Sequence, residues 1–183
     1  TQEPTQEPTQ EPTQEPTQEP TQEPSVTAEP SLTTTAAAEE GLDANGAYII
    51  VGGSQSSNAP SPSVLYDQNM SSLWTTNTTT APQTSFVVVD LGEVKSIGKV
   101  RWVFGTYGLA DRYRIDTSTD GVTWKRIVYR SNVPVGRWFE DTITGQARYV
   151  RWNFENPNND VQVGGLAEVQ VMPAGSTAPP PTP

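Results

Sequence analysis

The 183-residue sequence contains neither cysteine nor histidine. Without cysteine the chain has no disulfides and no thiolate metal ligands, and without histidine it has neither a Ser-His-Asp triad nor a Cys-His dyad. No apolar run approaches the roughly 20 residues that a membrane-spanning helix needs, so we expect no transmembrane segment. These absences exclude disulfide scaffolds, thiolate zinc modules and histidine-dependent hydrolases.

Charge is distributed unevenly along the chain. The formal net charge is −10, from 21 acidic and 11 basic residues. Nine glutamates lie within residues 1–41, which contain no lysine or arginine, so residues 42–183 carry a net charge of only −1. A nearly neutral folded part lacks the basic face that nucleic-acid binding requires, and we expect no nucleic-acid partner.

Both ends of the chain are rich in proline and threonine. Residues 1–24 repeat the sequence TQEP six times, and proline at every fourth position is incompatible with a helix. We predict that residues 1–41 form a disordered, polyproline-like spacer and that residues 174–183 form a second linker. All 15 aromatic residues lie between them, so the predicted folded domain spans residues 42–173. Linkers on both sides favour an extracellular module of a longer multidomain chain over a cytoplasmic protein with a disordered tail.

The domain has the sequence pattern of an all-β fold. Alternating apolar and polar residues predict strands with one buried face, whereas continuous β-branched runs predict strands buried on both faces. In the last predicted strand, this alternation places Glu168 and Gln170 on the outward face. The expected strands are 48–51, 86–91, 97–104, 113–117, 124–129, 138–142, 147–154 and 167–171. With turn residues such as Asp120 and Gly121 between them, about eight strands indicate an antiparallel β-sandwich or jelly roll.

Six segments of the domain match, in order, the motifs of one family. They are LYDQNMSSLW at 65–74, FVVVDLG at 86–92, IGKV at 97–100, YRIDTSTDGVTW at 113–124, ARYVRW at 147–152 and LAEVQV at 166–171. The domain resembles the discoidin, or coagulation factor 5/8 type C, family, which includes carbohydrate-binding module family 32. The resemblance implies an all-β, eight-stranded antiparallel jelly-roll β-sandwich of the galactose-binding-domain type, with ligand-binding loops at one end.

The resemblance also implies a structural Ca²⁺, which many members hold between the Asp-containing loop and the glutamate that opens the last strand. The implied ligands are the side chains of Asp67, Ser72 and Glu168, with backbone carbonyls near Asn69 and Ala167. Calcium prefers six to eight oxygen ligands, and this loop gathers carboxylate, amide and hydroxyl oxygens. Gln68 stands where the family usually has glycine. The alternative is a polar loop whose Asp and Ser side chains satisfy their own backbone.

Three segments between the predicted strands carry side chains suited to sugars: aromatic rings for the C–H face, and amides and arginine for the hydroxyls. The candidate ligand-binding residues are Tyr107, Arg137, Trp138, Asn158, Asn159 and Gln162. Glycines on both sides of Tyr107 favour an exposed loop tip, whereas the other aromatic residues, taken singly, are more often packed in a core. The galactose-binding members use a histidine that this chain lacks, so the resemblance does not imply their sugar specificity.

The sequence offers no plausible pair of catalytic carboxylates. Glu140 and Asp141 are adjacent in a predicted strand and point to opposite faces, so we expect solvated charges at a sheet edge rather than a glycosidase pair. The sequence therefore predicts a noncatalytic, extracellular or cell-surface module that binds a glycan or glycoconjugate within a larger protein. One alternative is a protein–protein adhesion or spacer module that binds another surface protein. A weaker one is binding to anionic phospholipid, which needs exposed apolar and basic side chains together.

Overall fold

The computed structural model describes residues 41–56, 59–77, 84–105, 112–131, 135–155 and 162–182. All of them belong to a compact unit that spans Ala38–Pro183. Residues 1–40, the greater part of the predicted disordered tail, lie outside the described residues. No helix in the described ranges is long and apolar enough to cross a membrane.

The described residues form an antiparallel β fold with one short 3-10 helix, η1 (Pro62–Leu65). The strands are β1 (Gly52–Gln55), β2 (Trp74–Asn77), β3 (Thr84–Phe104), β4 (Arg112–Ser118), β5 (Lys125–Ser131), β6 (Trp138–Glu155) and β7 (Gln162–Pro173). Every pairing between them is antiparallel, and their order is β2-β7-β3-β6-β4-β5 with β1 on β3. The predicted all-β antiparallel fold is confirmed.

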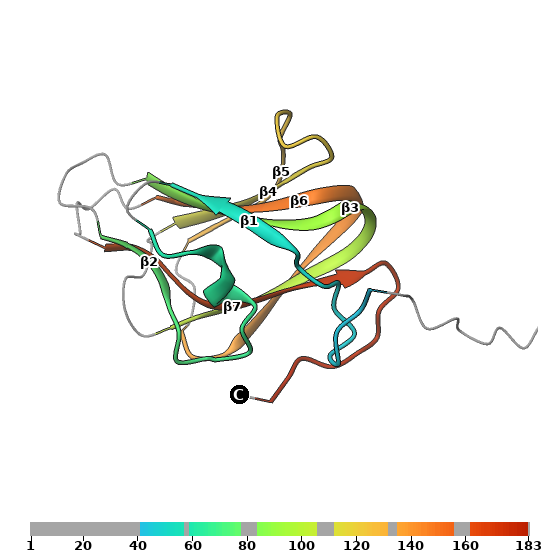
Figure 1. Cartoon of the computed structure of the whole chain (residues 1–183), viewed down its shortest axis with the longest axis horizontal. Helices are drawn as coiled ribbons and strands as arrows, with labels where there is room; N and C mark the ends of the chain where they lie inside the picture. The colour runs from blue at the N-terminus through green and yellow to red at the C-terminus, as the bar shows by residue number, and fades with distance from the viewer. Residues whose placement is uncertain are drawn as a thin grey trace, which may run out of the picture. The chain divides into compact units, whose positions relative to one another are not determined.

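The two longest strands, β3 and β6, run through both layers of the sandwich (Figure 1). The first half of β3 pairs with β1 and with the second half of β6, whereas its second half pairs with β7 and with the start of β6. The register shifts between Asp90 and Lys95 and again between Ile97 and Lys99. These irregularities lie at the bend, where Gly92 adopts a positive φ of 82° that favours glycine.

The strand boundaries differ from the prediction in three ways, and the described residues form seven strands. The predicted pairs 86–91 and 97–104, and 138–142 and 147–154, are each a single bent strand. The predicted strand 48–51 is wrong, because only an isolated bridge between Leu42 and Tyr48 forms there. The edge strands β1 and β2 were missed. An edge strand pairs on one side only, and the sequence of β1, GGSQ, has neither β-branched residues nor alternation.

Aromatic side chains dominate the core between the layers. Trp102 is fully buried and contacts Phe104 and Tyr113 edge-on, with ring centroids 5.0 and 4.8 Å away. Phe139 stacks on the same indole at 4.9 Å. Buried aromatic pairs of this geometry add to the stabilisation that comes from burying their area.

Asp141 lies buried beside this aromatic cluster. Its Oδ2 accepts hydrogen bonds from Trp102 Nε1 at 3.1 Å and Tyr113 OH at 3.2 Å, and its Oδ1 accepts one from Arg130 Nε at 2.7 Å. Glu140 and Asp141 point to opposite faces as predicted, but the expectation that both are solvated is wrong for Asp141, which is 1% exposed. The core tolerates this carboxylate because each of its oxygens has donors.

Residues 174–182, which we call the C-terminal strap, contact the outer face of β3 through Arg101. This arginine is 1% exposed, and its Nε donates to Glu140 at 2.9 Å. Its terminal nitrogens donate to the backbone carbonyls of Pro179, at 3.1 Å, and Ala178. The strap therefore supplies hydrogen-bond acceptors to the terminal nitrogens of the buried Arg101 guanidinium. β3 alone does not supply them.

Candidate functional site

The predicted sugar-binding residues are described only in part. Tyr107, Asn158 and Asn159 lie outside the described residues, and Gln162 is known as the first residue of β7, where its backbone pairs with Asn77. Arg137 is exposed, with its guanidinium 5.3 Å from the ring centroid of Phe139. The last candidate, Trp138, opens β6.

The described residues that flank the three predicted segments lie on neighbouring strands. Arg112 of β4 pairs with Glu155 of β6, so the strand ends that flank two of the segments are neighbours. The N–H of Gly136 donates to the carbonyl of Phe104 at 2.8 Å, and the N–H of Gly105 donates to the carbonyl of Gly165 at 2.7 Å. The strand ends that carry the three segments are therefore joined by backbone pairing.

The predicted metal loop folds around Asp67. Its Oδ1 accepts a hydrogen bond from the N–H of Asn69 at 2.8 Å, and its Oδ2 accepts one from the hydroxyl of Ser72 at 2.8 Å. Between them, Gln68 has a φ of 60°, the only positive value at a non-glycine residue in the described ranges. A glutamine thus holds left-handed geometry at the position where the family usually has glycine, at some conformational cost.

Glu168, in the last strand β7, lies next to this loop. Its side chain is 95% buried, and burial, reinforced by the carboxylate of Asp67, raises the pKa of Glu168 to about 8. Hydrogen bonds from the backbone N–H groups of Gln68 and Asn69 oppose that rise. One carboxylate oxygen, Oε2, is buried without a hydrogen-bond partner. Burial, a nearby carboxylate and an unpaired oxygen all disfavour the charged form of Glu168, and a bound cation would relieve each of them.

The structure brings together the residues that the resemblance assigned to calcium. Ala167 precedes Glu168 in β7, and the loop of Asp67, Asn69 and Ser72 faces that glutamate. No group of three or more acidic, histidine or cysteine side chains suited to a metal occurs in the described part of the chain. An ion at this place would therefore rely on two carboxylates and complete its shell with hydroxyl and carbonyl oxygens, which calcium accepts.

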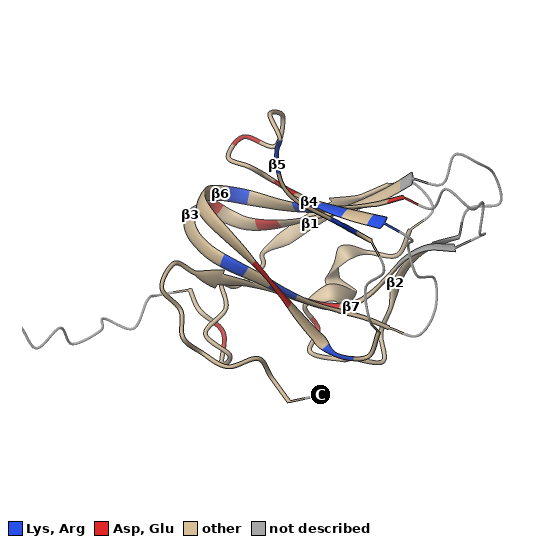
Figure 2. Ribbon diagram, turned by 180° about the vertical axis from the view of Figure 1, so that it is seen from behind, with Lys and Arg blue, Asp and Glu red and all other residues tan. Residues whose placement is uncertain are grey.

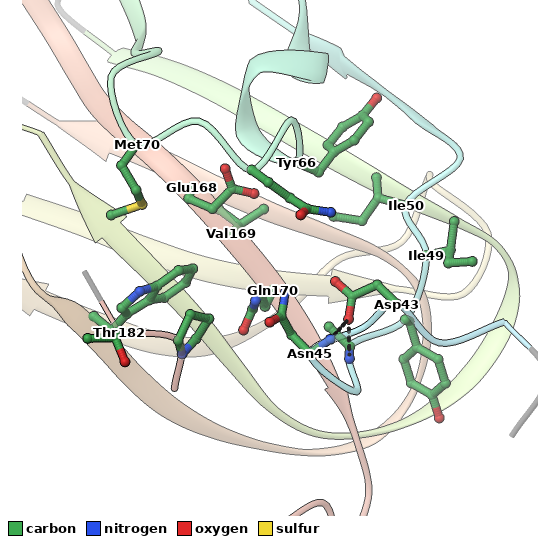
Figure 3. A pocket seen from close by; sticks show the side chains of 15 residues that line it. Asp43, Asn45, Ile49, Ile50, Tyr66, Met70, Glu168, Val169, Gln170 and Thr182 are labelled. Atoms are coloured by element: carbon green, nitrogen blue, oxygen red, sulfur yellow. Dashed lines mark hydrogen bonds between the residues drawn. The ribbon is translucent and has the colours of Figure 1, made fainter. Parts of the chain in front are cut away.

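A cavity of about 440 Å³ lies beside the loop (Figure 3). Its lining includes residues from the segment before β1, from the metal loop, from β6 and β7, and from the strap: Asp43, Ile50, Met70, Trp138, Gln170 and Thr182 among them. No sequence pattern indicated this cavity. Gln170 was correctly placed on the outward face of its strand, but that face is covered, and the residue is 5% exposed.

The comparisons with known proteins now decide the family. The model of the F5/8 type C domain matches residues 50–169, well over half of the chain. The chain belongs to the F5/8 type C domain family. Among curated proteins, none matches the sequence.

Solved structures resemble this F5/8 type C domain in fold. The family 32 carbohydrate-binding module of AlyQ, in complex with 4,5-unsaturated mannuronic acid, has 20% identity and a TM-score of 0.57 over 69% of this chain and 97% of that one. The module CpGH89CBM32-5 of Clostridium perfringens, in complex with GalNAc-beta-1,3-galactose, has 17% identity and a TM-score of 0.56, covering 66% and 93%. The family 32 module of C. perfringens NanJ, in complex with galactose, has 17% identity and a TM-score of 0.54, covering 65% and 92%. At these identities, the likeness shows the sandwich fold.

Most basic side chains of the F5/8 type C domain are held in ion pairs. Figure 2 shows acidic and basic positions interspersed along β3, β4 and β6. Seven of the 11 lysines and arginines contact a carboxylate within 4.0 Å. Arg148, for example, holds Asp90 with two nitrogens at 2.8 and 2.9 Å, and this hydrogen bonding lowers the pKa of Asp90. Because these basic side chains are already paired with carboxylates, they create little net positive potential that could attract an anionic partner.

Proposed function

We propose that this F5/8 type C domain is a noncatalytic carbohydrate-binding module with a structural Ca²⁺, part of a larger extracellular or cell-surface protein. Family membership, together with the sandwich fold shared with modules solved in complex with sugars, is the observation that carries the proposal. Tyr107 would stack on the C–H face of a sugar, and Asn158, Asn159 and Gln162 would bind its hydroxyls, because amides both donate and accept. Arg137 and Trp138 would form a second wall.

A glycan array identifies the sugar, and two variants then locate its site. We expect Tyr107→Ala to weaken binding of the best glycan at least tenfold, about 1.4 kcal/mol, without changing the melting temperature. We expect Asn159→Ala to change which glycans bind more than it changes the affinity for the best one. Normal binding by Tyr107→Ala, combined with loss of binding in Arg137→Ala, would move the site to the segment before β6.

Protein–protein adhesion is the second candidate, because it would use the same loops. A domain that binds no glycan on the array but captures a surface protein would establish it. Anionic phospholipid has less support, since the ion pairs described above neutralise most of the basic side chains. Pelleting with vesicles that contain or lack phosphatidylserine distinguishes this case.

For the calcium site, the unpartnered Oε2 of Glu168 is the supporting observation. Asp67, Ser72 and Glu168 would contribute side-chain oxygens, and Asn69 and Ala167 would contribute carbonyls. The ion supplies positive charge that neutralises the two carboxylates and ties the loop to β7. A ligand that binds only the folded state stabilises it by about 2.7 kcal/mol at a hundredfold excess over Kd.

Removing the metal tests this site. We expect EDTA to lower the melting temperature and Ca²⁺ to restore it, whereas Asp67→Ala and Glu168→Gln should melt at the same temperature with or without EDTA. Ser63→Ala, in the neighbouring exposed turn, serves as a control that keeps the response. A protein that contains no metal after purification and ignores both reagents would overturn the assignment.

A further inference from the structure

The cavity lies on the face of the sheet that points away from the core. Val103 of β3 pairs with Trp138 on one side and with Glu168 on the other, so these two side chains share a row across β6, β3 and β7. Arg101 pairs with Gln170 in the adjacent row on the same face. Two strands thus line one cavity: β6 contributes Trp138, and β7 contributes Glu168 and Gln170. Figure 3 labels the two β7 side chains.

Each of these three side chains has a buried polar atom without a hydrogen-bond partner. They are Trp138 Nε1, Glu168 Oε2 and Gln170 Oε1. Buried polar groups nearly always have partners, and an unpaired one typically costs about 1–3 kcal/mol. The proposed calcium accounts for the glutamate oxygen. The indole N–H of Trp138, a donor, and the amide oxygen of Gln170, an acceptor, remain unexplained. Both residues line the same cavity.

The rest of the lining is mostly apolar and carries no basic group. Ile50, Tyr66 and Met70 supply apolar surface, and the strap closes one side with Pro181 and Thr182. Neither lysine nor arginine occurs among the described residues that line the cavity, whereas two acids, Asp43 and Glu168, do. A volume of about 440 Å³ falls within the range of small-molecule sites, roughly 300–1,000 Å³.

We propose that this cavity is a second binding site, which takes one neutral pyranose unit. A sugar hydroxyl can donate to Gln170 Oε1 while another accepts from the Trp138 indole N–H, and the C–H face of the ring fits the apolar wall. A uronate is disfavoured, because the lining offers no basic side chain to pair with its carboxylate, and Asp43, which is not among the proposed calcium ligands, is acidic. The ligand class rests on the proposed glycan-binding function, but the site is separate from the loops that carry Tyr107 and Asn159.

The test is an ¹H–¹⁵N titration of the calcium-loaded protein with D-galactose, N-acetyl-D-galactosamine, D-glucose and D-mannose. The indole resonance of Trp138, identified by its loss in Trp138→Phe, should shift together with the side-chain amide of Gln170. The indoles of Trp74 and Trp102 are internal controls, since they already donate to Pro60 O at 3.1 Å and to Asp141 Oδ2. D-galacturonate is the charged control for galactose and should leave the Trp138 signal in place.

Two variants separate this site from the loop site. Gln170→Met keeps the size of the side chain but removes its acceptor, and it should weaken the sugar response of the Trp138 indole at least tenfold. Tyr107→Ala should abolish the response of the loop amides while that indole still shifts. If neutral sugars shift only loop amides, the second site is wrong and the proposed function stands. If no sugar shifts any resonance, the second site is also wrong, and the array then decides the proposed function.

Discussion

Asp141 is the most deeply buried carboxylate in the described part of the chain, and its two oxygens hold three donors in place. Asp141→Asn replaces one acceptor oxygen by an amide that faces those donors. We expect a loss of roughly 2–3 kcal/mol in the free energy of unfolding, measured by urea denaturation. Glu93→Gln is the matched control: its side chain is 72% exposed and pairs with Lys95, so its replacement should leave the free energy of unfolding almost unchanged. Equal effects of the two changes would contradict this account of the core.

Tyr113 makes the same network sensitive to alkali. Burial, and then the negative charge of Asp141, raise the pKa of Tyr113 far above its ordinary value of about 10. The folded protein therefore keeps a proton that the unfolded chain loses, so the contribution of Tyr113 to stability is constant below about pH 10 and falls above it, by at most about 1.4 kcal/mol per pH unit. Tyr113→Phe should reduce this slope in denaturation curves measured from pH 9 to 11. An unchanged slope would place the ionising group elsewhere.

Gln68 holds a backbone conformation that glycine adopts without strain. Gln68→Gly should therefore raise the free energy of unfolding by up to about 1 kcal/mol, whereas Gln68→Ala should not, because alanine meets the same steric cost. The comparison is made in EDTA, so that metal affinity does not enter. If both variants destabilise the domain alike, the glutamine side chain contributes more than its backbone costs.

At the scale of strands, the alternation of apolar and polar residues predicted most of the extended segments. It did not predict that two successive segments form one continuous, bent strand. Gly92 ends an apolar run and suggested a strand end, yet the backbone pairing resumes beyond the bend. The loop of Asp67 and Ser72 lies next to Glu168, so the residues that the family motif assigns to calcium are neighbours, and calcium itself stays a prediction. The cavity could not be predicted, because its walls come from segments far apart in sequence, and Gln170 alternates like an ordinary solvent-facing residue.

The C-terminal strap is an element that composition alone presents as a linker. Its carbonyls at Ala178 and Pro179 are acceptors for the buried guanidinium of Arg101, so deleting residues 175–183 should cost roughly 1–3 kcal/mol of stability. In an Arg101→Met background the same deletion should cost clearly less, since the cation that needs those acceptors is gone. Equal costs in both backgrounds, measured by thermal denaturation, would show that the strap acts through other contacts.

At the scale of the whole molecule, we expect two proline-rich ends of similar composition to differ in what they contribute to stability. Arg101 gives the C-terminal end a specific donor, and seven of the 11 basic residues are already paired within the domain. Residues 42–183 carry almost no net charge to attract the glutamates of the TQEP repeats, and the repeats themselves contain nothing apolar to bury.

Deleting residues 1–37 should accordingly leave the melting temperature unchanged at both low and high salt. Salt is the informative variable, because exposed charges more than about 10 Å apart are screened at 0.1 M ionic strength. A tail that bound the domain through its glutamates would stabilise it at low salt only, and truncation would then lower the melting temperature in that condition alone. A drop at both salt concentrations would instead indicate apolar or hydrogen-bonded packing of the tail, and the boundary of the folded domain would have to move toward the N-terminus.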